Sequence, residues 1–355
     1  MNQSVAPRIL FLADAGPEVG GGHVMRCLTL ARALTDRGAE CAFVESRAAA
    51  PILRRFGWPA QTLLAMADAR DLDALIASAE DFAERLQVDA IVIDHYGVDL
   101  RQEQPLRADF SRRLVAIDDL ANRRHSCDLL VDPGYGRRRE HYGTLIVPEC
   151  ASLVGPSHAL VRPEFAAARQ RAMGRRAKHG PVRRALIALG LTDVGGVTGR
   201  VVTALSDELG DVRLDIVLGA DAPSLPALRE AALTDRRLHL WVDTPEMASL
   251  MADADIAIGA GGSSVWERAT VGLPSATVIL AENQREMIDL MAGAGFTFAI
   301  DATQLDFEDR LRDCWRALVD DQTLRWSLAE RTAELCDGQG AERVAERIMG
   351  MIPKG

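Results

Sequence analysis

Short apolar runs alternate with longer amphipathic stretches along most of the chain, and this alternation constrains the fold more than any other feature. Each apolar run ends at a polar or glycine-rich turn, as buried strands do. Each amphipathic stretch carries apolar residues three or four positions apart, which is the spacing of a helix face. Strands that alternate with helices predict parallel sheets covered by helices. A chain of 355 residues is long enough for two such domains.

Both halves of the chain show the pattern. In the first half the predicted strands are Ile9–Ala13, Glu40–Glu45, Ala90–Asp94, Leu114–Asp118 and Leu129–Asp132. The predicted helices of this half are Val24–Arg37 and Asp71–Leu86. In the second half the predicted strands are Arg184–Ala188, Leu214–Leu218, Leu238–Trp241, Ile256–Gly259 and Ala276–Leu280. The second-half helices are Gly195–Leu209, Pro223–Leu233, Thr244–Ala252, Ser264–Val271 and Gln284–Gly293. The sequence therefore predicts an α/β protein of two doubly wound, Rossmann-like domains.

The domain boundaries follow from composition. We expect a first domain over residues 1–165 and a second over 184–340. Residues 166–183 are rich in Arg and contain several Gly and Pro turns, which indicates a solvated linker, with a phosphate clamp as the alternative. A last helix within 341–355 could pack back on the first domain.

The formal net charge of −10 argues against a surface that attracts nucleic acid or anionic lipid. The six cysteines form no CxxC pair and no zinc-like cluster with histidines, so we expect no metal and no disulfide framework. The first apolar run is too short for a signal peptide, and no run approaches the length of a membrane span. The composition is typical of a soluble cytoplasmic protein without membrane insertion.

A first glycine-rich turn, Gly20–Gly22, follows the first predicted strand and leads directly into a helix. Backbone N–H groups at such a turn can approach an anion closely, and the helix N-terminus adds partial positive charge. The turn matches neither a dinucleotide fingerprint, because Met25 stands where glycine is required, nor a Walker A loop, because His23 follows Gly22. His23 is placed either to act as a general base or merely to cap the turn.

A second glycine-rich turn, Gly259–Gly262, lies between a strand and a helix of the second half. Ser263 and Ser264 can bind phosphate oxygens or cap the helix. Glu267 can bind the hydroxyls of a sugar or complete a capping box. Ligands of open α/β sheets bind at the carboxyl ends of the strands. One such turn in each half predicts a sugar nucleotide or another diphosphate held between the domains.

A third cluster, Asp94, His95 and Tyr96, ends a strand of the first domain. Polar groups at that position are often catalytic, although a buried Asp that satisfies a loop has the same sequence pattern. The pair Asp118 and Asp119 ends the next strand in the same way.

Several segments, taken together, resemble one family closely: Gly22–Ala31, Ile93–Gly97, Ile117–Leu130, Gly155–Phe165 and Gly259–Gln284. The family is the UDP-2,4-diacetamido-2,4,6-trideoxy-β-L-altropyranose hydrolases of pseudaminic acid biosynthesis, which supplies sugars for flagellin and surface glycans. The resemblance implies a GT-B-like fold, with the active site in the interdomain cleft. The chain departs from the family pattern at Leu12, Leu191 and His158.

The resemblance also implies roles for particular residues. His23 would help water attack the anomeric carbon, with inversion and without a metal or cofactor, and Tyr96 would line the same site. UDP would be held by the second domain, with Glu267 at the ribose. The further substrate contacts on this pattern are Asp14, Gly21, Gly22, Arg26, Asp94, His95, Gly261, Gly262, Ser263, Ser264, Asn283 and Gln284.

Two other functions stay open. The chain could be a GT-B glycosyltransferase that uses a UDP-sugar donor, or a UDP-sugar-binding protein with weak catalysis. In each case the partners are a UDP-sugar and UDP, and other enzymes of the pathway could also bind.

Overall fold

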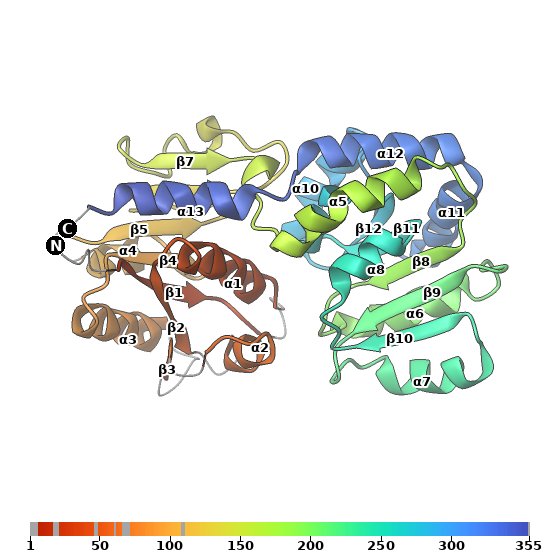
Figure 1. Cartoon of the computed structure of the whole chain (residues 1–355), viewed down its shortest axis with the longest axis horizontal. Helices are drawn as coiled ribbons and strands as arrows, with labels where there is room; N and C mark the ends of the chain where they lie inside the picture. The colour runs from red at the N-terminus through yellow and green to blue at the C-terminus, as the bar shows by residue number, and fades with distance from the viewer. Residues whose placement is uncertain are drawn as a thin grey trace. The chain divides into compact units, whose positions relative to one another are not determined.

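A computed structural model of the chain describes residues 6–16, 21–45, 49–59, 62–65, 72–107 and 111–353. The chain forms two compact units, shown in Figure 1. Unit 1 comprises Met1–Leu160 and Gln339–Gly355, and unit 2 comprises Val161–Gly338. Each unit is a parallel sheet with helices packed on it, which confirms the predicted α/β class.

The described residues of unit 1 form a seven-stranded parallel sheet in the order β3-β2-β1-β4-β5-β6-β7. The strands are β1 Arg8–Ala13, β2 Glu40–Glu45, β3 Leu63–Ala65, β4 Ala90–Asp94, β5 Arg113–Ile117, β6 Leu129–Asp132 and β7 Ala151–Val154. The strand order reverses between β1 and β4, and ligands of doubly wound sheets bind at the carboxyl ends of strands at such a point.

Helices cover both faces of this sheet. Along β1, Ile9 and Phe11 face one core, which also contains α1 and α13, whereas Leu10 and Leu12 face the other, which contains α3. This alternation is the two-residue period of a strand that is buried on both faces. The helices are α1 Gly22–Thr35, α2 Ala49–Arg55, α3 Leu72–Arg85, α4 Leu100–Leu106 and α13 Gly340–Met351, with 3-10 turns at Arg139–Tyr142 and Pro156–His158.

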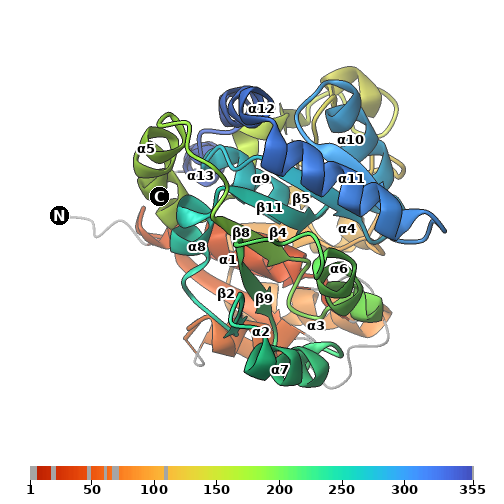
Figure 2. The ribbon, with the colours of Figure 1, turned by 90° about the vertical axis from the view of Figure 1, so that its right-hand side faces the viewer.

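The described residues of unit 2 form a six-stranded parallel sheet in the order β10-β9-β8-β11-β12-β13. The strands are β8 Arg184–Ala188, β9 Arg213–Leu218, β10 Leu238–Val242, β11 Ile256–Ala260, β12 Ser275–Ile279 and β13 Phe298–Asp301. Its helices, several of which face the viewer in Figure 2, are α5 Pro163–Arg176, α6 Val197–Leu205, α7 Leu225–Thr234, α8 Met247–Asp253, α9 Ser264–Thr270, α10 Glu282–Gly293, α11 Phe307–Asp320 and α12 Gln322–Leu335, with a 3-10 turn at Val194–Gly196.

The solvated linker expected over residues 166–183 is wrong for most of its length, because helix α5 runs through it. Pro163 starts the helix with its φ angle already set, and Phe165 and Ala172 are buried. The arginines that suggested solvation bind unit 2 instead. Arg169, for example, donates to the carbonyls of Thr270 and Cys336.

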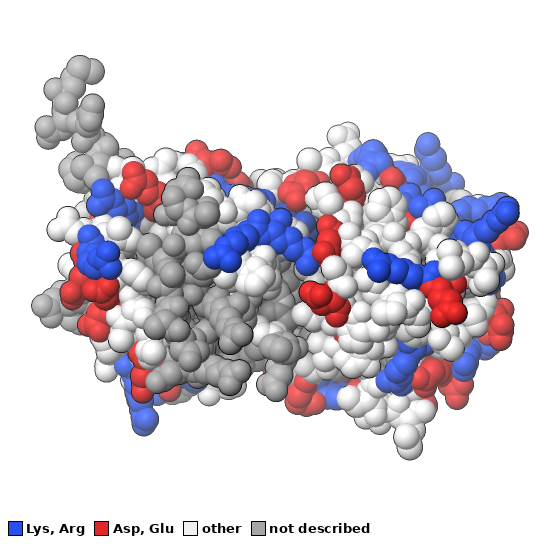
Figure 3. All heavy atoms as spheres, turned by 90° about the horizontal axis from the view of Figure 1, so that it is seen from below, with Lys and Arg blue, Asp and Glu red and all other residues white. Residues whose placement is uncertain are grey.

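The chain returns to unit 1 at its C-terminal end, where α13 packs against α1. In the described part of the chain, no helix has both the length and the apolar character needed to cross a membrane. On the face shown in Figure 3, acidic and basic side chains are interspersed, so the net charge of −10 is not gathered there into one acidic patch.

Candidate active site

The N-terminus of α1 lies after the carboxyl end of β1 and begins the candidate site in unit 1. Gly21 is the N-cap residue and has no side chain that could bind the first N–H groups of the helix. Those groups lack carbonyl partners within a helix, so an anion can bind them. Gly22 is the first helical residue and His23 the second, and His23 is 5% exposed. Gly20, which the sequence placed in the same turn, lies outside the described residues.

Asp94, the last residue of β4, pairs with two side chains of α1. Its Oδ1 lies 2.7 Å from Nδ1 of His23, and its two oxygens accept hydrogen bonds from Nε and Nη2 of Arg26 at 2.5 and 2.6 Å. Burial alone would raise the pKa of Asp94, but the charge of Arg26 and the hydrogen bonds from Arg26 and His23 outweigh it and hold that pKa well below its usual range. The carboxylate therefore stays ionised and fixes both side chains.

Tyr96 and Asp119 complete this group. The ring of Tyr96 meets the His23 ring edge-on, with centroids 4.4 Å apart. The Tyr96 hydroxyl donates to Asp119 Oδ1 at 3.0 Å, and Arg26 Nη1 donates to Asp119 Oδ2 at 2.6 Å. His23 thus has Asp94 at Nδ1 and a tyrosine ring beside it. A neutral imidazole that donates from Nδ1 carries its lone pair on Nε2, the atom that can accept a proton.

Asp14 and His95 form a looser pair in the same unit. His95 Nε2 lies 3.7 Å from Asp14 Oδ1, and its Nδ1 accepts a hydrogen bond from the Gly97 N–H at 3.0 Å. Burial lowers the pKa of His95, and the positive charge of Arg123 acts in the same direction, although Asp14 and Asp94 oppose them. His95 is therefore biased toward its neutral form.

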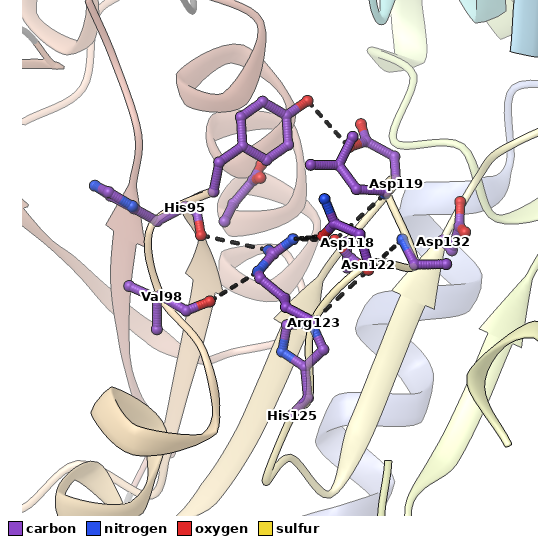
Figure 4. A network of polar contacts seen from close by, with 12 residues as sticks. His95, Val98, Asp118, Asp119, Asn122, Arg123, His125 and Asp132 are labelled. Carbon is purple, nitrogen blue, oxygen red and sulfur yellow. Dashed lines mark hydrogen bonds and ion pairs between the residues drawn. The ribbon is translucent and has the colours of Figure 1, made fainter. Parts of the chain in front are cut away.

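Arg123 supports the loops that follow β4 and β5, as Figure 4 shows. Its guanidinium donates to the carbonyls of Val98 and His95 at 2.9 and 3.4 Å, and to Asp118 at 2.6 Å. Asp118 also accepts the backbone N–H of Ala121, so this Asp satisfies its loop. One cation thus ties the segment that carries His95 to the segment that carries Asp118.

A buried group of ionisable side chains contacts Asp118, which follows β5. His125 Nδ1 lies 2.6 Å from Glu103 and its Nε2 lies 3.7 Å from Asp118. Burial would lower the pKa of His125, but the two carboxylates outweigh it and raise that pKa to about 9. Tyr142 donates its hydroxyl to Asp132 at 2.8 Å, and burial is the main cause that raises the pKa of Asp132 to about 7. The sequence identified none of these side chains as part of a network.

In unit 2, the glycine turn after β11 is packed tightly at one residue and open at another. A Cβ on Gly261 would lie 2.9 Å from Gln284 Oε1, whereas no described atom lies within 4 Å of a Cβ on Gly262. Ser263 is the N-cap of α9, and its side chain makes no capping hydrogen bond. The Ser264 hydroxyl accepts from the buried guanidinium of Arg268 at 3.1 Å. Gly262 and Ser263 are thus the positions of the turn that leave room for a ligand.

The remaining predicted residues of unit 2 have protein partners. Glu267 accepts from Nε and Nη2 of Arg162, both at 2.9 Å, so the expected ribose contact is engaged in an ion pair. Gln284 accepts the Leu280 N–H at 3.0 Å, which fixes the turn between β12 and α10. Asn283 lies in the first turn of α10.

The structure therefore brings the predicted residues together as two groups, one at the strand ends of each unit. Asp119 was missed as a site residue, although it contacts both Arg26 and Tyr96. The sequence feature that could have identified Asp119 is the pair of carboxylates at the end of β5, the strand next to β4. Among the described residues, no group of three or more His, Cys, Asp or Glu could hold a metal ion.

Comparison of the sequence with those of known proteins finds distant relatives. No family profile matches the chain. It is 23% identical over 290 residues to the UDP-2,4-diacetamido-2,4,6-trideoxy-beta-L-altropyranose hydrolase of Campylobacter jejuni. The aligned region covers 81% of this chain and 97% of the relative. It is also 23% identical over 336 residues to the spore coat polysaccharide biosynthesis protein SpsG of Bacillus subtilis, covering 94% and 95% of the two chains.

Solved structures give the fold. MurG of Acinetobacter baumannii superposes with a TM-score of 0.67 at 17% identity, over 97% of this chain and all of that one. The MnaA–UDP structure of S. aureus superposes with a TM-score of 0.67 at 14% identity, over 97% and 96%. The chain thus has the GT-B fold and is distantly related to a UDP-sugar hydrolase.

Proposed function

We propose that the protein hydrolyses a UDP-linked 2,4-diacetamido-2,4,6-trideoxyhexose to UDP and the free sugar, as a step of pseudaminic acid biosynthesis. The observation that carries this proposal is the contact of 2.7 Å between His23 Nδ1 and Asp94 Oδ1 in unit 1. A carboxylate at Nδ1 orients an imidazole and stabilises its cation once Nε2 has taken a proton. The 23% identity to a hydrolase of such a UDP-sugar supports the choice of substrate class.

In the proposed reaction, His23 Nε2 accepts a proton from water as the water oxygen bonds to the anomeric carbon. The bond from that carbon to the β-phosphate oxygen breaks, and UDP leaves with the bonding electrons. Attack opposite to the leaving group inverts the anomeric centre. Tyr96, whose ring packs edge-on against His23, would limit the positions that the water and the sugar can take.

Unit 2 would hold the diphosphate of the substrate. The space at Gly262 and the uncapped N-terminus of α9 suit a phosphate oxygen that accepts backbone N–H groups. Binding of UDP to Glu267 would require this carboxylate to share or release Arg162. A weakly charged site of this kind is compatible with a chain of net charge −10, since it relies on backbone donors.

The test is to incubate the purified protein with the UDP-linked sugar and follow UDP by phosphorus NMR. We expect UDP and free sugar in equal amounts and an unchanged rate with a chelator. In ¹⁸O-labelled water the UDP phosphorus signals should keep their unlabelled position, because the sugar C–O bond breaks. His23→Ala should lower kcat at least a hundredfold, whereas His239→Ala, in strand β10 of the other unit, serves as the control.

Intact substrate, or an unchanged rate in His23→Ala, would refute the proposal. The pH profile gives a second check: kcat/KM should fall toward acid pH, because a protonated imidazole cannot accept the proton from water.

A glycosyltransferase is the second candidate. The chain is 33% identical, over 129 residues that cover 36% of it, to a UDP-N-acetylglucosamine transferase of Acidiphilium cryptum that acts on an undecaprenol-linked acceptor. Release of UDP that depends strictly on an added acceptor would favour the transferase, and release in buffer alone would favour the hydrolase. A protein that binds UDP without turning over any diacetamido UDP-sugar would be a binding protein only.

A further inference from the structure

Unit 2 has a cavity of about 380 Å³ at the amino ends of its central strands. Arg183 precedes β8, Asp255 precedes β11 and Pro274 precedes β12, and all three line the cavity. The strands are parallel, so their amino ends lie at the opposite edge of the sheet from the glycine turn after β11. Figure 2 shows α5, α12 and β8, the elements around which the lining residues lie. The cavity is therefore separate from the glycine turn that forms the candidate-site group of unit 2.

The lining is strongly basic. It includes Arg175, Arg176, Lys178, Arg183 and Arg325, against a single carboxylate, that of Asp255. Asp255 is already used, because it pairs with Arg175 at 2.6 Å and accepts the backbone N–H groups of Arg183 and Arg184. The lining therefore carries an excess of positive charge, which Asp253, Asp320 and Asp321 outside the lining offset only in part, in a chain whose net charge is −10.

Two of these guanidinium groups, the partly buried Arg176 and the buried Arg325, bind only carbonyl oxygens. Arg176 donates to the carbonyls of Val271, Met251 and Ala254, and its Nε is buried without a hydrogen-bond partner. Arg325 is 8% exposed and donates to the carbonyls of Leu318, Val319 and Gly180. Within the described residues, no carboxylate lies at ion-pair distance from either group, and burial lowers the pKa of Arg176 to about 9.

These contacts explain the position of the two arginines but not their charge. Capping the end of α8 with Arg176 satisfies carbonyls that a helix leaves open. A poorly solvated cation with no carboxylate at ion-pair distance nevertheless remains unfavourable, although more distant carboxylates such as Asp255 reduce the cost. Lys178 and Arg183 add two exposed cations to the same cavity. Repulsion between like charges would favour positions in which these side chains lie farther apart. An anion bound among the four would remove this cost.

The cavity also has an aromatic wall. The His179 and Trp326 rings meet at 68° with their centroids 5.1 Å apart. His179 has a φ angle of 52°, a left-handed conformation that is unfavourable for a residue with a Cβ, and it brings the imidazole to this wall. Planar groups pack well on an indole face, and pockets of 300–1,000 Å³ suit small molecules.

We propose that this cavity binds a small phosphorylated molecule, with its phosphate groups among Arg176, Lys178, Arg183 and Arg325 and any planar part against Trp326. A membrane surface or a nucleic acid is a weaker fit, because the net charge of −10 repels extended polyanions. The site is independent of the proposed hydrolysis, since none of these residues belongs to the glycine turn or to unit 1.

Inorganic pyrophosphate, titrated into the full chain, is the probe. The chain has five tryptophans, whose indole N–H signals are resolved by proton–nitrogen NMR. Trp326 reports on the cavity, and Trp266, in α9, reports on the glycine turn. We expect the Trp326 signal, assigned with Trp326→Phe, to shift and saturate at submillimolar pyrophosphate. Binding at the glycine turn alone would shift Trp266 and leave Trp326 in place.

The matched variants remove equal charge inside and outside the cavity. Lys178→Gln/Arg183→Gln changes two exposed side chains of the lining, so the fold is preserved, and should weaken binding at least tenfold. Arg229→Gln/Arg236→Gln changes two exposed arginines of unit 2 outside the lining and should leave binding unchanged. A Trp326 signal that does not move, or equal losses in both variants, overturns the proposal. So does binding to anionic phosphatidylserine vesicles with which pyrophosphate does not compete.

Discussion

Asp94 holds two side chains of α1 at once, and this makes it the residue on which the geometry of unit 1 depends most. It is fully buried, and it contacts His23 through one oxygen and Arg26 through both. The sequence allowed a buried Asp that merely satisfies a loop. The structure gives that role to Asp118, whereas Asp94 orients ionisable side chains.

Replacement of Asp94 tests this difference. Asp94→Asn leaves the buried Arg26 with Asp119 as its remaining carboxylate, so we expect a loss of about 3 kcal/mol in the free energy of unfolding, measured by urea titration. Asp119→Asn is the matched variant. Its side chain is 25% exposed, and we expect a loss of no more than about 1 kcal/mol. Equal losses in the two variants would mean that Asp94 is not the dominant partner of Arg26.

His125 makes the stability of unit 1 depend on pH. Its pKa of about 9 in the folded protein exceeds the ordinary value of 6.5, so its contribution is complete below pH 6.5 and is lost as the pH rises through 9. The raised pKa of Asp132, about 7, also makes the folded protein less stable as the pH rises, but this loss is nearly complete by pH 7. The loss that His125 causes begins at about that pH. The range above pH 7 therefore reports mainly on His125.

We expect the melting temperature of the native chain to exceed that of His125→Gln by several degrees at pH 6.5, and this difference to shrink by pH 9.5. The largest free-energy contribution is on the order of 3 kcal/mol. His239→Gln, on β10, is the control and should show the same pH dependence as the native chain. A difference that is constant between pH 6.5 and 9.5 would contradict the proposed pKa.

At the scale of elements, the sequence predicted the central strands and missed strands at the edges of both sheets. β3, β7 and β13 were missed, and each is the last strand on its side of a sheet. Every residue of β7 is only partly buried, as are most residues of β13. In β7 the polar Ser152 interrupts the apolar run that a strand covered on both faces requires, whereas the short apolar runs of β3 and β13 were not distinguished from loops.

Only the part of the candidate site that local sequence signals mark could be predicted from the sequence. Glycine turns and strand ends are local signals, and they placed His23 and Asp94 at the same edge of a sheet. The pairing of Asp119 with Arg26 joins residues 93 positions apart. No local pattern encodes that contact, because it depends on the register of β4 beside β5. The basic cavity corresponds only to the less favoured alternative for residues 166–183, a phosphate clamp, because its residues come from four separate segments and the arginines suggested a solvated linker.

The end of β11, where Gly259 lies, and the glycine turn that follows it provide a test at the scale of one element. A Cβ on Gly259 would lie 2.2 Å from Nη1 of Arg268, whose guanidinium is held by Ser264, Ala260 and Thr277. We therefore expect Gly259→Ala to lose about 3 kcal/mol in the free energy of unfolding. Gly262→Ala should change it by less than about 0.5 kcal/mol, because its Cβ would meet open space.

The same pair of variants separates stability from binding. If UDP phosphates approach the turn at Gly262, then Gly262→Ala should weaken UDP binding, measured by calorimetry, without lowering the melting temperature. Unchanged UDP affinity would mean that the phosphates bind elsewhere. A stable Gly259→Ala variant would show that Arg268 can move aside.

At the scale of the whole molecule, unit 1 is discontinuous in sequence. The chain builds most of unit 1, then all of unit 2, and then returns with α13. Ala341, Val344, Ala345 and Ile348 of α13 are buried in the core that contains α1. Unit 1 therefore lacks part of its core until the last segment of the chain has packed.

The first residue of α13, Gly340, packs closely against the rest of unit 1. A Cβ on Gly340 would lie 2.2 Å from the backbone oxygen of Ala159, and no side-chain rotation can relieve a clash with backbone. Gly350, near the other end of the same helix, is exposed, and no described atom lies within 4 Å of its Cβ. The two glycines thus separate the effect of helix propensity from the effect of packing.

We expect the two substitutions to act in opposite directions. Gly340→Ala should displace α13, lower the free energy of unfolding by about 3 kcal/mol and reduce the hydrogen-exchange protection of α1. Gly350→Ala should raise the free energy of unfolding by about 0.5 kcal/mol, because alanine favours the helix more than glycine does. Exchange in β9, a central strand of unit 2, should be unchanged by Gly340→Ala, because α13 contributes no residue to the core of that unit. If β9 lost protection together with α1, the two units would unfold as one, and α13 would stabilise the whole chain rather than unit 1.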